Sequence, residues 1–66
     1  MKVKVNGEKK EVFGPLTLKE LLEKFNPGSR RKVVVLNRKL VMESEWDSKM
    51  IQENDEVEIL NMVGGG

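Results

Sequence analysis

The sequence predicts an α+β fold in which a mixed β-sheet of four to five strands packs on one helix. Apolar and charged residues alternate near both ends of the chain, which is the pattern of strands with one buried face. Between them, one short segment carries apolar residues at helical spacing. A chain of 66 residues forms a single small domain, which buries only about 60% of its unfolded surface and has modest stability.

The first two strands are expected to form a hairpin. The alternation over residues 1–6 places both valines of this segment on one face. Asn6-Gly7 follows, and this dipeptide is a strong hairpin signal because both residues tolerate positive φ. The second strand is predicted over about residues 9–13, with Val12 facing inward.

The helix is predicted to begin after Thr17. Thr17 and Glu20 fit a capping box, in which each side chain accepts a hydrogen bond from an otherwise unpaired backbone amide. Leucines and Phe25 then recur on one face that packs on the sheet. Asn26-Pro27-Gly28 ends the helix.

Three further strands complete the prediction. Asn37-Arg38-Lys39 and Asn54-Asp55 are expected to form turns, and the stretch 42–54 is expected to contain one helical or 3₁₀ turn. The remaining strands are placed at residues 32–36, 40–41 and 56–62.

This element order is that of a β-grasp fold, in which a sheet wraps around one helix. It requires the first and last strands to be parallel neighbours in the centre of the sheet. The preference for right-handed crossover connections favours this arrangement, because the helix leads the chain back to the same sheet.

The amino-acid composition argues against several classes of function. The chain contains no Cys and no His, so it lacks thiolate ligands, a disulfide framework and the commonest general base. A carrier or adaptor is therefore favoured over an enzyme, with no bound metal or cofactor. The net charge of +1 argues against nucleic acid as a partner. Without a membrane-length apolar run or a signal peptide, a cytoplasmic protein that is monomeric when free is expected.

The C-terminus is the most informative segment. Val63 is followed only by Gly64, Gly65 and Gly66. Glycines without side chains form a thin string that can thread into a narrow cleft and present the terminal carboxylate to an enzyme. The alternative is a frayed terminus or an expression scar. We expect a folded domain over residues 1–63 and a flexible tail over residues 64–66.

The sequence resembles the ThiS family of sulfur carriers within the ubiquitin-like β-grasp superfamily, along its whole length. The matching motifs stand in family order: Met1-Lys2-Val3, Val5-Asn6-Gly7-Glu8, Thr17-Leu18, Glu20-Leu21-Leu22, Leu36-Asn37, Val41, Ser44-Glu45-Trp46, Asp55, Val57-Glu58-Ile59 and Val63-Gly64-Gly65-Gly66. Three places depart from the family pattern. Arg38 and Asn54 replace turn glycines, and Met42-Glu43 stands where Pro-Arg is common.

The resemblance implies a chemistry for the terminus. A ThiF-like activating enzyme, using ATP and magnesium, adenylates the carboxylate of Gly66. A persulfide donor then supplies sulfur to form a thiocarboxylate, which a ThiG-like thiazole synthase uses in thiamin synthesis. The alternatives are a sulfur carrier for molybdopterin or tRNA thiolation, a ubiquitin-like protein modifier, and a plain interaction module.

Strand alternation also predicts a partner interface. If Val34 is in the core, the side chains of four apolar residues point outward near the tail: Val33, Val35, Leu60 and Met62. The alternatives are that the opposite alternation holds and buries them, or that they are scattered exposed residues without a partner.

Other features are expected to be structural. Arg30-Arg31-Lys32 is interpreted as a solvated loop and Trp46 as a residue at the boundary of the core. The acidic residues Glu53, Asp55, Glu56 and Glu58 are interpreted as a charged strand edge that resists aggregation. Alternatively, the basic segment could be an electrostatic docking site and Trp46 an interface hot spot. The acidic residues could bind a basic partner or a cation.

Overall fold

A computed structural model describes residues 1–28 and 31–62 of the chain. The described chain contains five strands, one α-helix and one 3₁₀ helix. In chain order these are β1 (Lys2–Val5), β2 (Glu8–Glu11), α1 (Leu18–Phe25), β3 (Lys32–Leu36), β4 (Lys39–Val41), η1 (Glu43–Glu45) and β5 (Glu56–Asn61).

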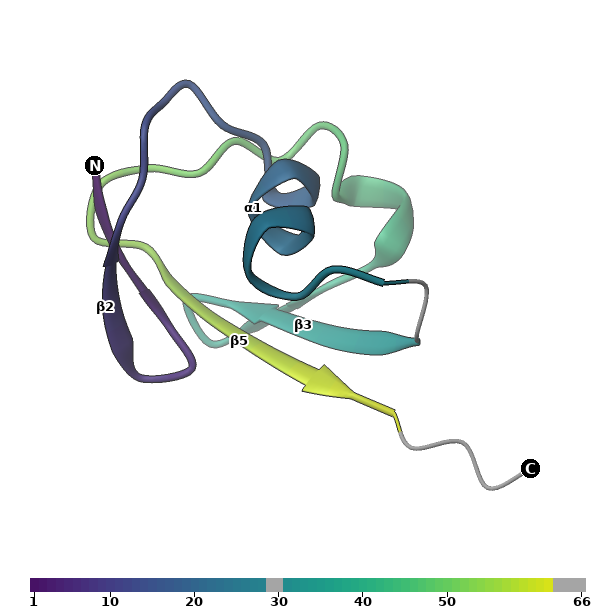
Figure 1. Ribbon diagram of the computed structural model, residues 1–66. Coiled ribbons are helices and arrows are strands. Elements are labelled where there is room, and N and C mark those ends of the chain that lie inside the picture. Colours follow the sequence, from purple (N-terminus) through teal and green to yellow (C-terminus); the bar gives the residue numbers. More distant parts are fainter. Residues whose placement is uncertain (29–30, 63–66) are drawn as a thin grey trace.

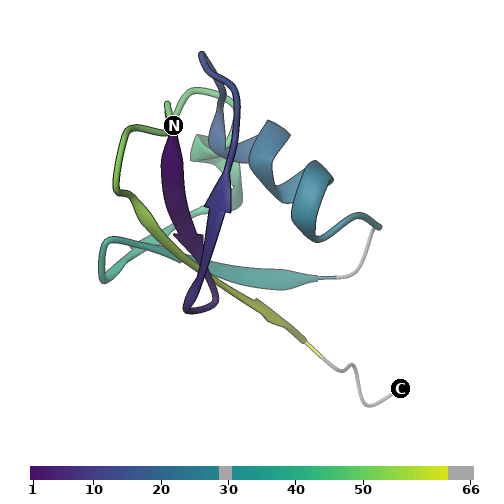
Figure 2. The same cartoon turned by 60° about the vertical axis from the view of Figure 1, so that its left-hand side comes forward.

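The strands form one mixed sheet in the order β2-β1-β5-β3-β4. β1 and β5 are parallel neighbours, and the other pairs are antiparallel. Helix α1 lies across one face, which we call the inner face (Figures 1 and 2). The expected β-grasp fold, including the central pairing of the first and last strands, is confirmed.

The helix begins as the sequence predicts. Thr17 is the N-cap, its side chain accepts from the Glu20 amide, and the Glu20 carboxylate accepts from the Thr17 amide at 2.9 Å. At the other end, the Lys32 ammonium donates to the Asn26 carbonyl at 2.8 Å. A cation there suits the negative end of the helix dipole. Lys32 therefore stabilises a helix end, where a solvated loop was expected.

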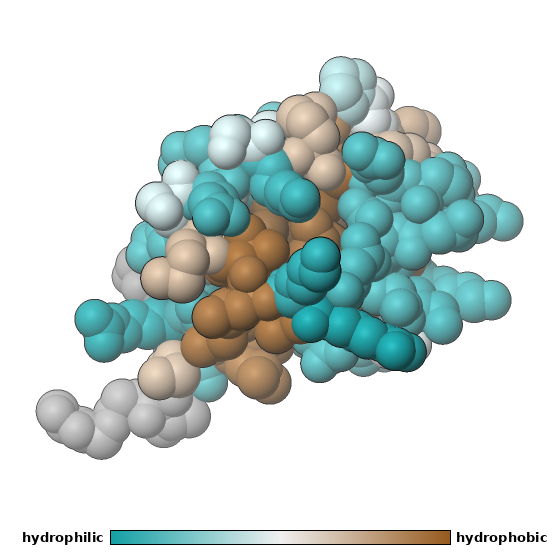
Figure 3. All heavy atoms as spheres, turned by 180° about the vertical axis from the view of Figure 1, so that it is seen from behind, coloured by the Kyte–Doolittle hydropathy of each residue, from teal (hydrophilic) through white to brown (hydrophobic). Residues whose placement is uncertain are grey.

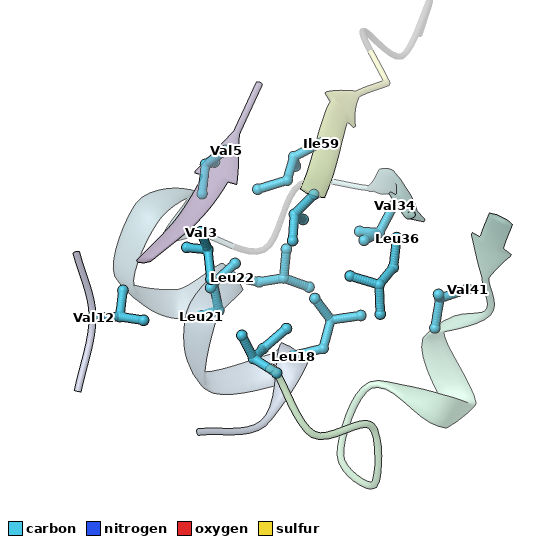
Figure 4. Close-up of a cluster of buried hydrophobic side chains, with 12 residues drawn as sticks. Val3, Val5, Val12, Leu18, Leu21, Leu22, Val34, Leu36, Val41 and Ile59 are labelled. Atoms are coloured by element: carbon cyan, nitrogen blue, oxygen red, sulfur yellow. The ribbon is translucent and has the colours of Figure 1, made fainter. Parts of the chain in front are cut away.

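The core lies between α1 and the inner face of the sheet (Figure 4). It contains aliphatic side chains only, which is consistent with the alternation of the strands and the leucine spacing of the helix. Its twelve buried members are Val3, Val5, Val12, Leu18, Leu21, Leu22, Val34, Leu36, Val41, Ile51, Val57 and Ile59. Met1, Leu16, Phe25 and Trp46 pack against it.

Several strand boundaries differ from the prediction. β2 begins at Glu8 and β4 at Lys39, each one residue earlier than expected, so Lys39 belongs to the strand and not to the turn. β2 ends at Glu11, because Val12 turns into the core and pairs its backbone with that of Met1. Phe13, expected at the end of this strand, is 88% exposed and lies outside it. β5 ends at Asn61, one residue earlier than expected.

The interpretation of the acidic residues was wrong in two respects. β5, which carries Glu56 and Glu58, is the central strand of the sheet and not an edge. The Asp55 side chain is buried, where it accepts from the Gln52 amide at 2.7 Å and from Asn37 Nδ2 at 3.0 Å. Asp55 therefore fixes the start of β5 against the β3–β4 turn.

Candidate functional site

The outer face of the sheet, which α1 does not cover, carries apolar side chains over β3, β4 and β5. Val33 lies opposite Leu60, and Val35 lies opposite Leu40. Leu60 is 59% exposed, whereas Val33 and Val35 are half-buried. Their neighbours Val34 and Ile59 are in the core. The strands therefore have the alternation on which the predicted partner interface depends.

Three more exposed side chains extend this area. Met62 is 53% exposed, and its amide donates to the Arg31 carbonyl at 2.8 Å, which continues the β3–β5 pairing. Leu40 is 63% exposed and Met42 is 59% exposed. Extending the β3–β4 register by one residue places Met42 beside Val33. We call the set the outer apolar patch: Val33, Val35, Leu40, Met42, Leu60 and Met62.

Leu40 and Met42 were missing from the predicted interface. The sequence carried a signal for them, since they flank Val41 at strand spacing and so share the face opposite to it. The strand was too short to fix which face Val41 takes before the core was known. Seen from behind, the molecule shows apolar side chains gathered in one area and bordered by hydrophilic ones (Figure 3).

The other half of the outer face is charged. Lys4 on β1 lies opposite Lys9 on β2, and Lys2 lies opposite Glu11. Between the two halves runs β5, whose exposed Glu56 and Glu58 separate the lysines from the outer apolar patch. One half therefore has the character of a protein contact surface and the other that of a solvated surface.

Trp46 has the structural role that the sequence predicts, at the boundary of the core. The indole N–H of Trp46 donates to the Val41 carbonyl at 3.1 Å, and its half-buried ring packs against the core. Within the described ranges 1–28 and 31–62, no group of three or more His, Cys, Asp or Glu is arranged to hold a metal ion. Among the same residues, no helix is long and apolar enough to cross a membrane.

The residue predicted to react, Gly66, and the two predicted to thread into the cleft, Gly64 and Gly65, follow this surface along the chain. Gly64, Gly65 and Gly66 lie outside the described residues, as does Arg30 of the basic segment. The last described residue, Met62, belongs to the outer apolar patch. In the sequence, only Val63 separates the patch from the three glycines.

Comparison with known proteins identifies the family. The ThiS family model matches residues 3–66, nearly the whole chain. This chain belongs to the ThiS family. A protein of that family from Geobacter metallireducens, described as thiamine biosynthesis protein (ThiS), has a crystal structure that superposes with a TM-score of 0.83. It is 30% identical, and the match covers 100% of both chains.

Two further relatives differ in length. The uncharacterized protein ycf40 of Porphyra purpurea is 36% identical over 64 residues, which is 97% of this chain and 90% of that protein. A thiazole synthase of Paramagnetospirillum magneticum is 30% identical over 66 residues, and the match covers all of this chain. It spans only 20% of that synthase, so ThiS-family sequence occurs within a much larger protein.

Proposed function

We propose that this protein is a sulfur carrier of thiamine biosynthesis whose C-terminal glycine carries the sulfur. The observation that carries the proposal is the ThiS-family match, which includes the three terminal glycines. The similarity to the Geobacter protein of thiamine biosynthesis and to thiazole synthases supports this pathway over molybdopterin or tRNA thiolation.

The proposed chemistry begins at the carboxylate of Gly66. This carboxylate attacks the α-phosphate of ATP in a ThiF-like enzyme, with magnesium on the phosphates, and pyrophosphate leaves. The terminal sulfur of a persulfide then attacks the acyl-adenylate and displaces AMP. A thiol cleaves the resulting acyl disulfide and releases the thiocarboxylate, which a ThiG-like thiazole synthase takes as its sulfur source.

In this scheme the chain is a co-substrate and supplies no catalytic group. Gly64 and Gly65 have no side chains to obstruct the cleft that holds the acyl-adenylate. The outer apolar patch docks the activating enzyme, because exposed apolar side chains that gather on one face are typical of protein contact surfaces. The enzymes then bind the folded domain, and this binding places the C-terminus in their active sites.

Intact mass spectrometry tests the proposal. With ATP, magnesium, the ThiF-like enzyme and a sulfide source, the protein gains the mass difference between sulfur and oxygen, localised to the C-terminal peptide. The matched control appends one alanine after Gly66, which leaves the domain unchanged and displaces the carboxylate by one residue. Small misplacements of reacting groups cost large factors in rate, so the control is not thiolated.

Two outcomes would contradict this assignment. Equal thiolation of the extended protein would show that the terminus is not the reactive group, and an interaction module would then fit better. Isopeptide conjugates between Gly66 and lysines of other proteins, without thiocarboxylate, would instead identify a protein modifier. Transfer of sulfur to the thiazole synthase in a reconstituted reaction separates thiamine synthesis from the other thiolation pathways.

A further inference from the structure

Strand β5 has a neighbour along its whole length on one side only. β3 pairs with it from Val57 to Asn61. On the other side, β1 pairs only at Glu56 and Val57. Figures 1 and 2 show the β1–β2 hairpin turning back while β5 runs on toward the C-terminus. The second half of β5 therefore has an open edge inside the sheet.

The side chain of Asn6 marks where this edge begins. Its Oδ1 accepts from the Ile59 amide at 2.7 Å and so takes the place of a further β1 carbonyl. Past it, the Ile59 carbonyl and the Asn61 amide and carbonyl face the same side, because alternate residues of a strand bond to alternate neighbours. These three groups have no backbone or side-chain partner among the described residues.

The edges at the two ends of the sheet are protected, whereas this one is not. All four residues of β2, Glu8–Glu11, are charged, and β4 has only three residues and begins with Lys39. Charge and shortness are the usual means by which native proteins prevent strand addition. The open edge of β5 instead carries Ile59, Leu60 and Asn61, none of which is charged.

Space for an added strand exists beside this edge. A hollow on this side of β5 is lined by residues of the first hairpin turn, including Asn6 and Gly7, and by β5 residues from Glu56 to Leu60. Apart from Gly7 itself and its two neighbours in the chain, no residue has an atom within 4 Å of the position that a Cβ on Gly7 would take. The turn that ends β1 therefore leaves the flank of β5 accessible.

We propose that an extended segment of the thiazole synthase pairs with the open edge of β5 from Ile59 to Asn61. An extended backbone is the ligand whose spaced donors and acceptors match those of a strand edge. The edge is continuous with the outer apolar patch through Leu60 and leads into the glycine segment. This inference rests on the proposed function, and the synthase is chosen because ThiS-family sequence occurs within thiazole synthases.

Backbone N-methylation tests the pairing. The 66-residue chain is made by chemical synthesis with N-methyl-Asn61, which removes the free donor and keeps every side chain. The matched control is N-methyl-Lys9. The β1–β2 register and its two-residue loop leave the Lys9 amide facing outward on β2. N-methyl-Asn61 is expected to weaken binding to the thiazole synthase about tenfold, the effect of one unmade hydrogen bond, while N-methyl-Lys9 binds as the native chain does.

Amide hydrogen exchange of the native chain provides a second measurement, which does not depend on folding of a variant. Exchange at Asn61 slows when the synthase is added, while exchange at Lys9 does not change. Unchanged exchange at Asn61 in a chain that binds the synthase would overturn the edge inference alone. If exchange at Asn61 slows at high concentration of this chain alone, without the synthase, the edge pairs with a second copy, and the inference is likewise overturned. A native chain that neither binds the synthase nor gives it sulfur would overturn the proposed function together with this inference.

Discussion

The two hairpins that flank β5 have the same turn but opposite outer surfaces. Each is closed by a two-residue loop that begins with asparagine, Asn6-Gly7 in one and Asn37-Arg38 in the other, and all four residues have positive φ. Each asparagine also bonds to β5: Asn6 Oδ1 accepts from the Ile59 amide and Asn37 Oδ1 from the Glu56 amide at 2.9 Å.

The difference lies in what each hairpin presents to solvent. The outer side of β1 and β2 carries lysines and Glu11, whereas that of β3 and β4 carries Val33, Val35 and Leu40. The turns and their asparagines hold the central strand in register, so they determine the architecture. The outward side chains are not constrained by that architecture, so they are available for recognition.

The largest expected effect is the loss of Asn37. Asn37→Gly keeps the positive φ at little cost, so it isolates the side-chain hydrogen bonds to Asp55 and Glu56. Because the substitution leaves the buried Asp55 Oδ1 without its donor, while Oδ2 still accepts from the Gln52 amide, we expect the free energy of unfolding to fall by about 2–3 kcal/mol. Urea denaturation measures this. A loss no larger than that of Asn6→Gly, which removes the single hydrogen bond to the Ile59 amide, would show that the Asp55 contact is not important.

The second prediction separates the two outer surfaces. Leu40→Asp places a charge on the outer apolar patch, and Lys9→Asp makes the matched change on the other hairpin. Both side chains are exposed, so both variants keep the native circular dichroism spectrum. We expect Leu40→Asp to lower the rate of the proposed adenylation roughly thirtyfold, as loss of an interface hot spot does, and Lys9→Asp to have little effect. Equal adenylation rates for the two variants would show that the activating enzyme docks on another surface.

A smaller effect is expected at the first turn. Asn6→Gly again keeps the positive φ and removes a single hydrogen bond, which leaves the Ile59 amide without its acceptor. We expect a loss of about 1–2 kcal/mol in the free energy of unfolding. Amide exchange localises it, since Ile59 is deprotected while Val57, still paired with β1, is not. Uniform deprotection of β5 would contradict this local role.

The smallest effect has the opposite sign. Arg38 has a φ of 68°, a conformation that costs a residue with a side chain about 1 kcal/mol and glycine almost nothing. Arg38→Gly therefore raises the midpoint of thermal unfolding, by the few degrees that about 1 kcal/mol gives in a domain of this size. Gly7→Ala at the other turn, where φ is 83°, lowers it. A lower midpoint for Arg38→Gly would mean that the arginine side chain makes stabilising contacts.

The fold was predictable from the sequence because its signals are local. The capping box at Thr17, the Asn6-Gly7 turn and the strand alternation each specify an element without reference to the rest of the chain. The boundary at Phe13 was missed because Val12 enters the core by pairing with Met1, a contact between distant residues. Asp55 was misinterpreted for a similar reason, since its burial depends on Asn37, 18 residues away.

The candidate site was predicted only in part. The outward alternation of β3 and β5 gave Val33, Val35, Leu60 and Met62, and the structure adds Leu40 and Met42 through strand pairing. The open edge of β5 has no sequence signature of its own, because it results from the difference in length between β1 and β5. The role of Gly64, Gly65 and Gly66 stays a prediction.

The central position of β5 links synthesis of the chain to its folding. The sheet is β2-β1-β5-β3-β4, so each of the two hairpins reaches the other only through the last strand to be synthesised. A ribosome-bound chain lacking residues 56–61 cannot form a continuous sheet, because β1 and β3 have no neighbour in common without β5. Pairing of β1 with β5 also closes a loop of more than 50 residues, which is a slow step in folding. A product terminated before β5 would therefore stay unfolded and be degraded by cellular proteases.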